Sequence, residues 1–507
     1  MTGDLTDNEK IADYVSMEQY DRRYSYKVMG ILVGLVLIVM YIEGMLTPSL
    51  PSIEADFNIT AAQASLVLSM YMVGGVALTP IVGKLGDIHG KRKVLLITLI
   101  IYAFAVSVTG FSPTFNFMIV SRTIQGVGLS IMPLGFSLVR EEFPKDLVPK
   151  AQALISAMFG AGFAISIPLG SWVSNNFGWR WTYHSAIPFI VALVVLSVVV
   201  IKESRFRRPD VKIDYAGAAI LALSLSMFVF ALSEGATWGW LSDYTIALVF
   251  AGFVLLIPLV WYERRYMLKG GEAILNFKLL AMRNVLVANL ILAIAGIGMF
   301  LSMQALTYRF IYGFNDSIFT TGLSIVPFAI GTFVFAPIAG VLVTKIGVKP
   351  LAILGTIMSA LGFLLQATLP GYDGMLLYEF ITGSGFSLLN GTIINFIVLT
   401  VNPRDMGIAT AMNSTFRFLG SSIGAPVAGS ILATYSTIRT VPGPHGGYAS
   451  SIPEGVAFTY IFIIAAIVFF SAALLIPLGK EVLGKRATKL SGQQVQFADT
   501  GTKLEQA

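Results

Sequence analysis

The chain alternates between long apolar segments and short polar or charged connections. Each apolar segment has about 20 residues, the length of an α-helix that crosses the hydrocarbon core of a bilayer. This pattern predicts an all-α integral membrane protein. Its fourteen expected transmembrane helices lie at approximately residues 28–49, 64–83, 94–112, 116–139, 151–174, 181–201, 215–234, 244–262, 285–305, 320–343, 351–369, 375–399, 407–434 and 457–478.

Composition supports the same class. Of the 507 residues, 55% are hydrophobic and only 12% are charged, which is more apolar surface than a soluble chain of this length can bury. The absence of cysteine excludes disulfides, cysteine metal sites and a thiol nucleophile. A net charge of +6 then reflects membrane topology and contact with anionic lipid headgroups, and we expect no nucleic-acid partner.

The distribution of basic residues predicts the orientation. If the N-terminus is cytoplasmic, nearly all lysines and arginines fall on the cytoplasmic side, and the opposite loops contain only Arg180, Arg309 and Arg439. Positive-inside bias therefore predicts a multi-pass protein of the plasma membrane with both termini in the cytoplasm. The first 27 residues are polar and rich in acids, so we expect the first transmembrane helix to direct insertion.

A charged segment, GKLGDIHGKRK from Gly83 to Lys93, connects the second and third predicted helices. Its length predicts a tight hairpin. Gly83 and Gly86 lack a Cβ atom and allow close helix approach, whereas Gly90 allows the positive φ that reverses the chain. Asp87 is placed to bond a nearby backbone or to face a helix N-terminus.

The sequence contains an internal repeat with an offset of 257 residues. PIVGKLGDIHG begins at Pro80 and PIAGVLVTKIG begins at Pro337. The same offset relates Asn58 to Asn315, Gly74 to Gly331, Gly83 to Gly340, Gly90 to Gly347, Arg122 to Glu379, Gly126 to Gly383 and Gly128 to Gly385. Such spacing predicts two pseudo-symmetric six-helix bundles, with substrate bound near the midplane where they meet.

Two six-helix bundles leave two helices over, which we expect to form an insertion between the bundles. The predicted domains are a cytoplasmic tail at 1–27, bundles at 28–202 and 281–479, an inserted two-helix segment at 203–280 and a second cytoplasmic tail at 480–507. A glycine- and proline-rich segment, STIRTVPGPHGGYASSIPEG, connects the last two helices. We expect it to be a flexible connection, and a cover over the mouth of the cavity is the alternative.

Several segments resemble signatures of the major facilitator superfamily. The loop from Gly83 to Lys93 resembles the signature between its second and third helices, and Ser121 to Gly135 resembles its fourth-helix signature. Phe177 to Pro188 and Met412 to Gly424 resemble two further family elements. Ile213 to Trp240 resembles the seventh span of the fourteen-span drug:proton antiporter family. The resemblance implies the major facilitator fold and transport by alternating access.

Two segments depart from the family pattern. Antiporters carry a G-P-x-x-G-G element in the fifth span, whereas this chain has SIPLGS from Ser166 to Ser171. The family also has an aspartate in the first span where this chain has Ile42, followed by Glu43. One residue turns a side chain about 100° around a helix. The sequence therefore leaves open whether Glu43 faces the cavity.

Four ionisable residues lie inside predicted spans: Glu43, Arg122, Glu379 and Arg417. A charge at the bilayer centre costs roughly 2.5–3.5 kcal/mol on insertion scales, so such residues face protein or a water-filled cavity. We expect Glu43 or Glu379 to bind the coupling proton, under the influence of Arg122. The alternative is a permanent ion pair between Arg122 and Glu379 that only ties the two bundles together.

Polar residues inside the spans are further candidates for the substrate cavity. Gln125, Asn390 and Arg417 are placed to bond substrate, although a bond between helices or to a freed backbone carbonyl is the alternative. The resemblance also implies a conformational latch at the cytoplasmic side. In this latch, Asp87 contacts the region after Lys349 or forms a salt bridge with Arg140. The residues expected to form the latch are Gly83, Asp87, Gly90, Lys91, Arg92 and Arg140.

The first functional prediction is a secondary active transporter that exports hydrophobic or cationic small molecules in exchange for protons. The alternatives are a facilitator or proton symporter for a small anionic metabolite, bound by Arg122 and Arg417, and a transport-inactive membrane sensor. The chain contains no Walker sequence, phosphate loop, nucleophile–base pair or metal-ligand spacing. We therefore expect no enzyme activity, catalytic residue, metal or cofactor. Its expected partners are substrate, protons and lipids, with no obligate protein partner.

Overall fold

A computed structural model describes residues 21–482, except residues 145, 204–206, 208–211, 403–405 and 444–445. Most of the predicted tails 1–27 and 480–507 lies outside the described residues. Helix α2 already begins at Arg22, six residues before the expected start of the first span.

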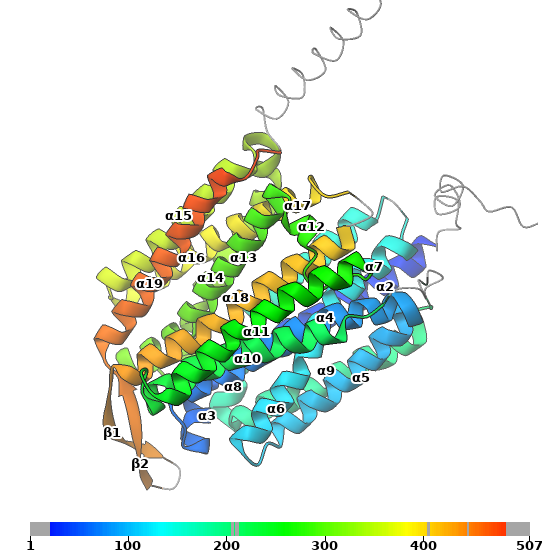
Figure 1. The fold of residues 1–507 in the computed structure, drawn as a ribbon. Coiled ribbons are helices and arrows are strands. Elements are labelled where there is room, and N and C mark those ends of the chain that lie inside the picture. Colours follow the sequence, from blue (N-terminus) through cyan, green and yellow to red (C-terminus); the bar gives the residue numbers. More distant parts are fainter. Residues whose placement is uncertain are drawn as a thin grey trace, which may run out of the picture.

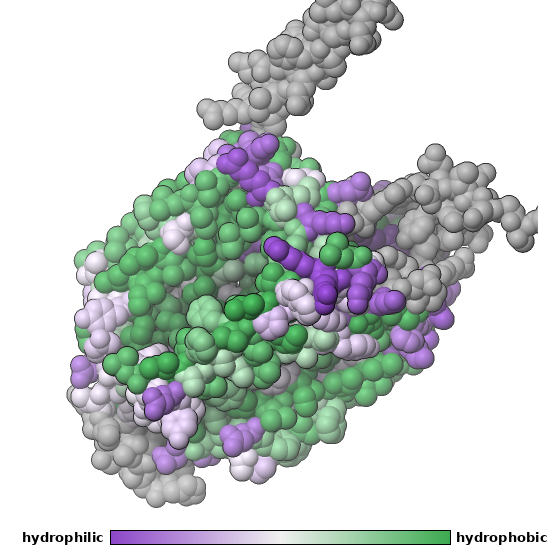
Figure 2. Space-filling model, viewed as in Figure 1, coloured by the Kyte–Doolittle hydropathy of each residue, from purple (hydrophilic) through white to green (hydrophobic). Residues whose placement is uncertain are grey.

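The described chain is almost entirely helical, as predicted (Figure 1). Thirteen helical segments are long and apolar enough to cross a membrane, and α8 is a continuous 30-residue helix over the expected fifth span. Apolar side chains cover the sides of the helices on the face seen in Figure 2, and hydrophilic side chains gather toward its ends. The prediction of fourteen membrane helices is confirmed.

The N-terminal half contains six membrane-spanning segments. The first and fourth are interrupted by short 3-10 turns, η1 at Thr47–Ser49 and η2 at Gly126–Ser130. The helices of this half are α2 (Arg22–Gly44), α3 (Leu50–Phe57), α4 (Ala61–His89), α5 (Lys91–Gly110), α6 (Phe115–Gln125), α7 (Ile131–Glu142), α8 (Val148–Phe177) and α9 (Trp179–Val200).

The insertion forms α10 (Tyr215–Trp238) and α11 (Asp243–Leu268), followed by the short α12 (Phe277–Leu280). Helix α10 packs against α4 of the N-terminal half and α18 of the C-terminal half. On α4, Gln63 Nε2 donates to the Glu234 carboxylate of α10 at 3.1 Å. The inserted helices therefore lie along the seam between the two halves.

The C-terminal half repeats the six-span arrangement. Its helices are α13 (Arg283–Tyr308), the π-helical turn η3 (Arg309–Gly313), α14 (Ile318–Ile346), α15 (Val348–Thr368), α16 (Tyr372–Ile393), α17 (Asn395–Val398), α18 (Met406–Thr434), α19 (Gly455–Leu475) and the 3-10 turn η4 (Ile476–Leu478). Strands β1 (Ser436–Gly443) and β2 (Gly446–Pro453) connect α18 to α19.

The backbone reproduces the 257-residue repeat at its turns. Asn58 and Asn315 are the non-glycine residues with positive φ in the described chain, at 51° and 59°. Gly90 and Gly347 have φ values of 102° and 96° and each separates two helices. These four positions form two pairs that are each 257 residues apart, so the two halves turn in the same way.

Glycines in the repeat allow equivalent helix contacts. A Cβ on Gly126 would lie 2.6 Å from the Tyr71 carbonyl oxygen, and a Cβ on Gly383 would collide with the carbonyl oxygen of Phe328. Tyr71 and Phe328 are themselves 257 residues apart. Close approach of small residues is the usual way in which membrane helices pack tightly.

Both halves also cap their third helix in the same way. The Glu203 carboxylate accepts from the backbone nitrogens of Arg92 and Lys93, at 3.2 and 3.1 Å, at the start of α5. The Glu481 carboxylate accepts from the backbone nitrogens that start α15, at 2.8 and 2.9 Å. A carboxylate satisfies unpaired N–H groups and favours the positive end of the helix dipole.

The loop between α4 and α5 differs from expectation in two respects. Asp87 Oδ1 pairs with Lys91 Nζ at 3.0 Å, and Lys91 Nζ also pairs with Glu141 Oε1 at 2.5 Å. The partner of Asp87 is therefore Lys91, whereas Arg140 is exposed. The predicted salt bridge between Asp87 and Arg140 is wrong in this structure. A Cβ on Gly83 would meet nothing within 4 Å, so the predicted close approach there is wrong as well.

The two halves meet closely at the end of the molecule that carries β1 and β2, which we call the hairpin end. Tyr308 Oη of α13 donates to Glu54 Oε2 of α3 at 2.8 Å, and both side chains are buried. Gln304 Nε2 donates to the Ala61 carbonyl oxygen at 3.0 Å. These two bonds join the halves at the hairpin end.

The hairpin itself is a departure from the expected flexible connection. Strands β1 and β2 pair antiparallel from Ser436 opposite Pro453 to Gly443 opposite Gly446. The segment from Thr437 to Val441 contains four β-branched residues, which favour strand geometry over a flexible loop. The glycines and prolines of this segment favour a loop, and the β-branched residues between them outweigh that preference.

Substitution of Gly126 tests the close contact between α4 and η2. In Gly126→Ala the added Cβ would lie 2.5 Å from Gly75 N, so we expect overpacking to lower stability by about 1–3 kcal/mol. The measurement is thermal unfolding in detergent. Gly83→Ala is the matched control, because its Cβ meets open space and should leave the unfolding midpoint unchanged. Equal midpoints for the two variants would contradict the contact.

Candidate functional site

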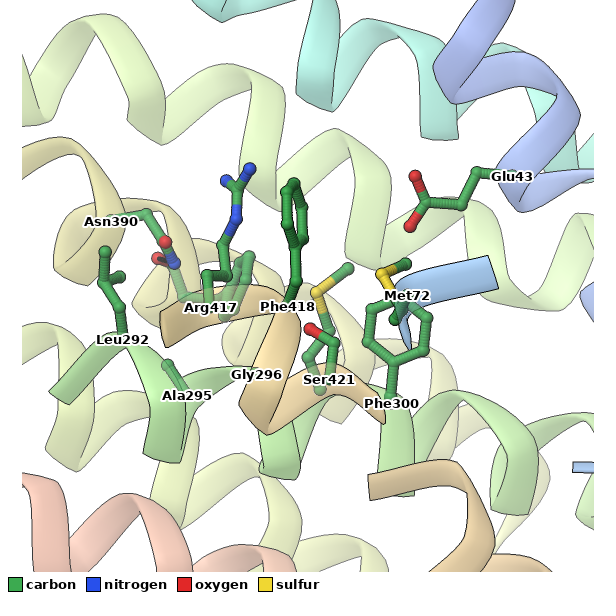
Figure 3. Close-up of a pocket in the computed structure, with 12 residues that line it drawn as sticks. Glu43, Met72, Leu292, Ala295, Gly296, Phe300, Asn390, Arg417, Phe418 and Ser421 are labelled. Atoms are coloured by element: carbon green, nitrogen blue, oxygen red, sulfur yellow. Dashed lines mark hydrogen bonds between the residues drawn. The ribbon is translucent and has the colours of Figure 1, made fainter. Parts of the chain in front are cut away.

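A narrow pocket lies between the two halves. Most of its wall is apolar, and its polar side chains are those of Glu43, Arg417, Asn390 and Ser421 (Figure 3). The N-terminal half contributes residues of α2 and α4, and the C-terminal half contributes residues of α13, α16 and α18. The apolar wall includes Met72, Leu292, Met299, Phe300, Phe386 and Phe418.

Glu43 lies in the last turn of α2 and is 3% exposed. Its neighbour Gly44 brings α2 against α8, because a Cβ there would collide with the Ser166 side chain. The Glu43 side chain then projects into the pocket, and Oε2 has no hydrogen-bond partner among the described residues. The structure thus answers the question that the sequence left open about the direction of Glu43.

Arg417 lies on α18 and lines two pockets. The first is the pocket shared with Glu43, and the second lies beside Val36 and Met40 of α2. The guanidinium carbon lies 5.3 Å from the ring centre of Phe418, within the range of a cation–π contact. Arg417 and Arg122 are the cations that act electrostatically on Glu43.

Asn390 reaches the same pocket from α16. Its Nδ2 donates to the Phe386 carbonyl oxygen one turn earlier, at 2.9 Å. This bond orients the amide on the pocket wall. Asn390 and Arg417 are therefore the two predicted cavity candidates that the structure brings together with Glu43.

Arg122 lies outside this pocket, fully buried within the N-terminal half. Its Nε donates to the Val67 carbonyl oxygen at 2.9 Å, and Nη1 donates to Gln125 Oε1 at 2.8 Å. The guanidinium carbon also lies 4.6 Å from the ring centre of Tyr71. Backbone, amide and aromatic partners thus hold the charge within one half.

Gln125 completes this network and does not line the pocket. Its Nε2 donates to Thr109 Oγ1 at 2.7 Å and to the Ala105 carbonyl oxygen at 3.2 Å, both on α5. Gln125 therefore makes the interhelical bonds that were the alternative for it, and its prediction as a cavity residue is wrong in this structure.

Glu379 is also fully buried, within the C-terminal half. Gln366 Nε2 donates to Glu379 Oε1 at 2.8 Å and contacts Thr382 Oγ1 at 3.4 Å. The positions of Glu379, Gln366 and Thr382 are those of Arg122, Thr109 and Gln125 shifted by 257 residues. Arg122 and Glu379 each find partners in their own half, so the alternative of an ion pair between them is wrong here.

The structure also identifies site residues that the sequence analysis did not single out. The apolar wall comes from four helices, α4, α13, α16 and α18, and in the sequence its methionines and phenylalanines cannot be distinguished from lipid-facing ones. The abundance of 19 methionines and 35 phenylalanines was the single available signal. Among the described residues, no group of three or more acids and histidines is arranged to hold a metal ion.

Known proteins resemble this chain along most of its length. The sequence profile of the Major Facilitator Superfamily matches residues 32–282 and 286–499. Multidrug resistance protein 3 of Bacillus subtilis is 25% identical over 94% of this chain and 98% of its own length. The uncharacterized MFS-type transporter Rv1877 of Mycobacterium tuberculosis is 29% identical over 79% of this chain, and the match spans only 58% of that relative.

A solved structure supports the fold alone. The crystal structure of the human organic anion transporter MFSD10 (TETRAN) aligns with a TM-score of 0.59 over 89% of this chain and 99% of that protein, at 15% identity. Helix arrangement, internal repeat and profile match agree. The chain is a multi-pass membrane protein that belongs to the major facilitator superfamily of transporters.

Proposed function

We propose that this protein is a proton-coupled exporter of hydrophobic or cationic small molecules. The observation that carries the proposal is a single carboxylate, Glu43, in a mostly apolar pocket between the two halves, where Arg417 is the other ionisable group. Methionine and phenylalanine side chains adapt to varied apolar shapes. Two relatives, named Multidrug resistance protein 3 and Multidrug resistance protein Stp, support the same substrate class.

Exchange follows from competition at Glu43. When Glu43 is ionised, its charge attracts a cationic substrate, and when it is protonated, that attraction disappears and the pocket favours release. Arg417 lines the same pocket and keeps it from accumulating negative charge. Glu43 would then bind either a proton or the substrate, one after the other. The substrate leaves to the side from which the proton enters.

The bonds at the hairpin end suggest which side is closed. We propose that this end is extracellular, with both termini in the cytoplasm of a plasma-membrane protein, because the predicted loops on the opposite end carry most of the basic residues. Tyr308 and Glu54 then form part of an outer seal, which must break for the pocket to open outward.

The loop between α4 and α5 belongs to the opposite, cytoplasmic gate in this proposal. Asp87 is here engaged with Lys91 inside its own half. In the outward-open state Asp87 would contact the region after Lys349 and hold the cytoplasmic side closed. Gly90, Arg92 and the pairing of Lys91 with Glu141 position this loop.

A second function is favoured by the position of Arg417. Because Arg417 lines both pockets, a small anion would find a cation along its path, and protonation of Glu43 would remove the competing negative charge. That arrangement fits a proton symporter or facilitator for an anionic metabolite.

Glu43→Gln tests the exporter directly. In proteoliposomes, a pH gradient imposed on the wild-type protein should drive a cationic dye against the proton flow, and reversing the gradient should reverse the dye flux. Glu43→Gln should lose this dependence because its amide cannot release a proton. Glu379→Gln, altered outside the pocket, should retain it. Dye and protons moving in the same direction would favour the symporter, and normal coupling in Glu43→Gln would exclude the mechanism.

Tyr308→Phe tests the outer seal. Losing one hydrogen bond between the halves should favour the outward-open state by about 1 kcal/mol, which is about a fivefold change in the ratio of states. Because the chain has no cysteine, a single cysteine at Met299 reports pocket access by its labelling rate from outside. Tyr102→Phe is the control, since the Tyr102 hydroxyl has no bond to another described residue. Equal labelling in both variants would argue against the seal.

Asp87→Asn tests the cytoplasmic latch. The amide keeps the size of the side chain and loses its charge, so we expect turnover to fall several-fold while dye binding to the purified protein stays unchanged. Transport rate and equilibrium dye binding are measured on the same preparation. Normal turnover would show that Asp87 is not a latch.

A further inference from the structure

Two buried carboxyl groups face each other in the inserted helices, away from the central pocket. Asp214 directly precedes α10 and is 1% exposed, and Glu263 lies near the end of α11 and is 0% exposed. The two carboxyl groups thus come from different helices of the insertion. Burying two negative charges side by side in a membrane protein is strongly unfavourable.

Each carboxyl group uses only one oxygen in a structural bond. Asp214 Oδ1 caps α10 by accepting from the backbone nitrogen of Gly217 at 2.8 Å, and Glu263 Oε2 accepts from the backbone nitrogen of Leu275 at 3.3 Å. Asp214 Oδ2 and Glu263 Oε1 are buried without a hydrogen-bond donor among the described residues. The backbone bonds therefore account for one oxygen of each carboxyl group, and the Tyr262 hydroxyl is a further hydrogen-bonding group that faces Asp214.

These two unbonded oxygens point to the same place. A Cβ on Gly217 would collide with Asp214 Oδ2 and would lie 2.8 Å from Glu263 Oε1. The glycine thus leaves room for the two oxygens to approach each other. Two carboxyl oxygens interact favourably at such an approach when one of them carries a proton that it donates to the other.

The surroundings allow one negative charge on the pair but not two. Lys84 of α4 interacts electrostatically with both carboxyl groups, and its Nζ donates to the Glu272 carbonyl oxygen in the loop after α11. The other titratable groups that face the pair are the Glu272 carboxylate and the hydroxyls of Tyr262 and Tyr266 on α11. Lys84 also interacts with the Glu272 carboxylate, so one ammonium faces three carboxyl groups, and ionisation of both Asp214 and Glu263 would leave unbalanced buried charge.

We propose that Asp214 and Glu263 form a proton-binding site in the inserted helices, in which one proton bridges Asp214 Oδ2 and Glu263 Oε1. The proton is taken up from water, and the occupied pair keeps a single negative charge opposite Lys84. Lys84 belongs to the segment that enters the loop between α4 and α5. Release of this proton would add a negative charge beside Lys84, where the end of α4 contacts the insertion.

Infrared difference spectroscopy of the purified protein in nanodiscs tests the site without a transport assay. At neutral pH the wild-type spectrum should contain a protonated-carboxyl band that is lost, by the same amount, in Asp214→Asn and in Glu263→Gln. Both substitutions preserve the oxygen that makes the structural bond. Glu234→Gln, on the same helix and bonded to Gln63, should leave the band unchanged.

Two further measurements distinguish a shared proton from a bound metal cation. Lys84→Met removes the balancing cation, so the band should persist to higher pH. An unchanged band in both Asp214→Asn and Glu263→Gln, or a loss in only one of them, would overturn the shared proton. A band that grows when sodium and potassium are replaced by choline would assign the site to a metal cation instead. Because the readout does not involve the central pocket, its result is independent of export by Glu43.

Discussion

An ionisable side chain inside a membrane-spanning helix must find its partners within the protein, because lipid offers none. This constraint determines which charged residues are available for function. Arg122 is held by a backbone carbonyl, by Gln125 and by the face of Tyr71. Glu379 is held by Gln366. Arg122 Nη2, Glu379 Oε2 and Glu43 Oε2 are all unbonded among the described residues, so what distinguishes Glu43 is that it alone of the three lines the pocket between the halves.

The two halves use one scaffold for different chemistry. Threonine, arginine and glutamine at 109, 122 and 125 become glutamine, glutamate and threonine at 366, 379 and 382, and both triads connect the third and fourth helices of their half. The glycines that bring those helices together keep their identity in the repeat. The backbone contact has therefore been retained while the charge has been inverted, so the pocket between the halves lies in an asymmetric electrostatic environment.

The inserted helices add a third element along the seam between the halves. Helix α10 contacts α4 and α18, and α11 packs against α10. The buried acids of the insertion interact with Lys84 near the end of α4. When the two halves rotate against each other, the inserted helices must either move with one half or slide along the other. The insertion is thus connected to the same loop that we assign to the cytoplasmic gate.

The sequence by itself determined the class, the number of membrane helices and the repeat, because these depend on local hydrophobicity and on regular spacing. It also identified Gly90 as a turn residue, since positive φ is a local property. It did not determine which charged residues share a pocket. Facing depends on helix rotation and on contacts between segments far apart in the chain, and one residue of register separates Ile42 from Glu43. Only the tertiary structure brought Glu43, Asn390 and Arg417 together and kept Arg122 apart from Glu379.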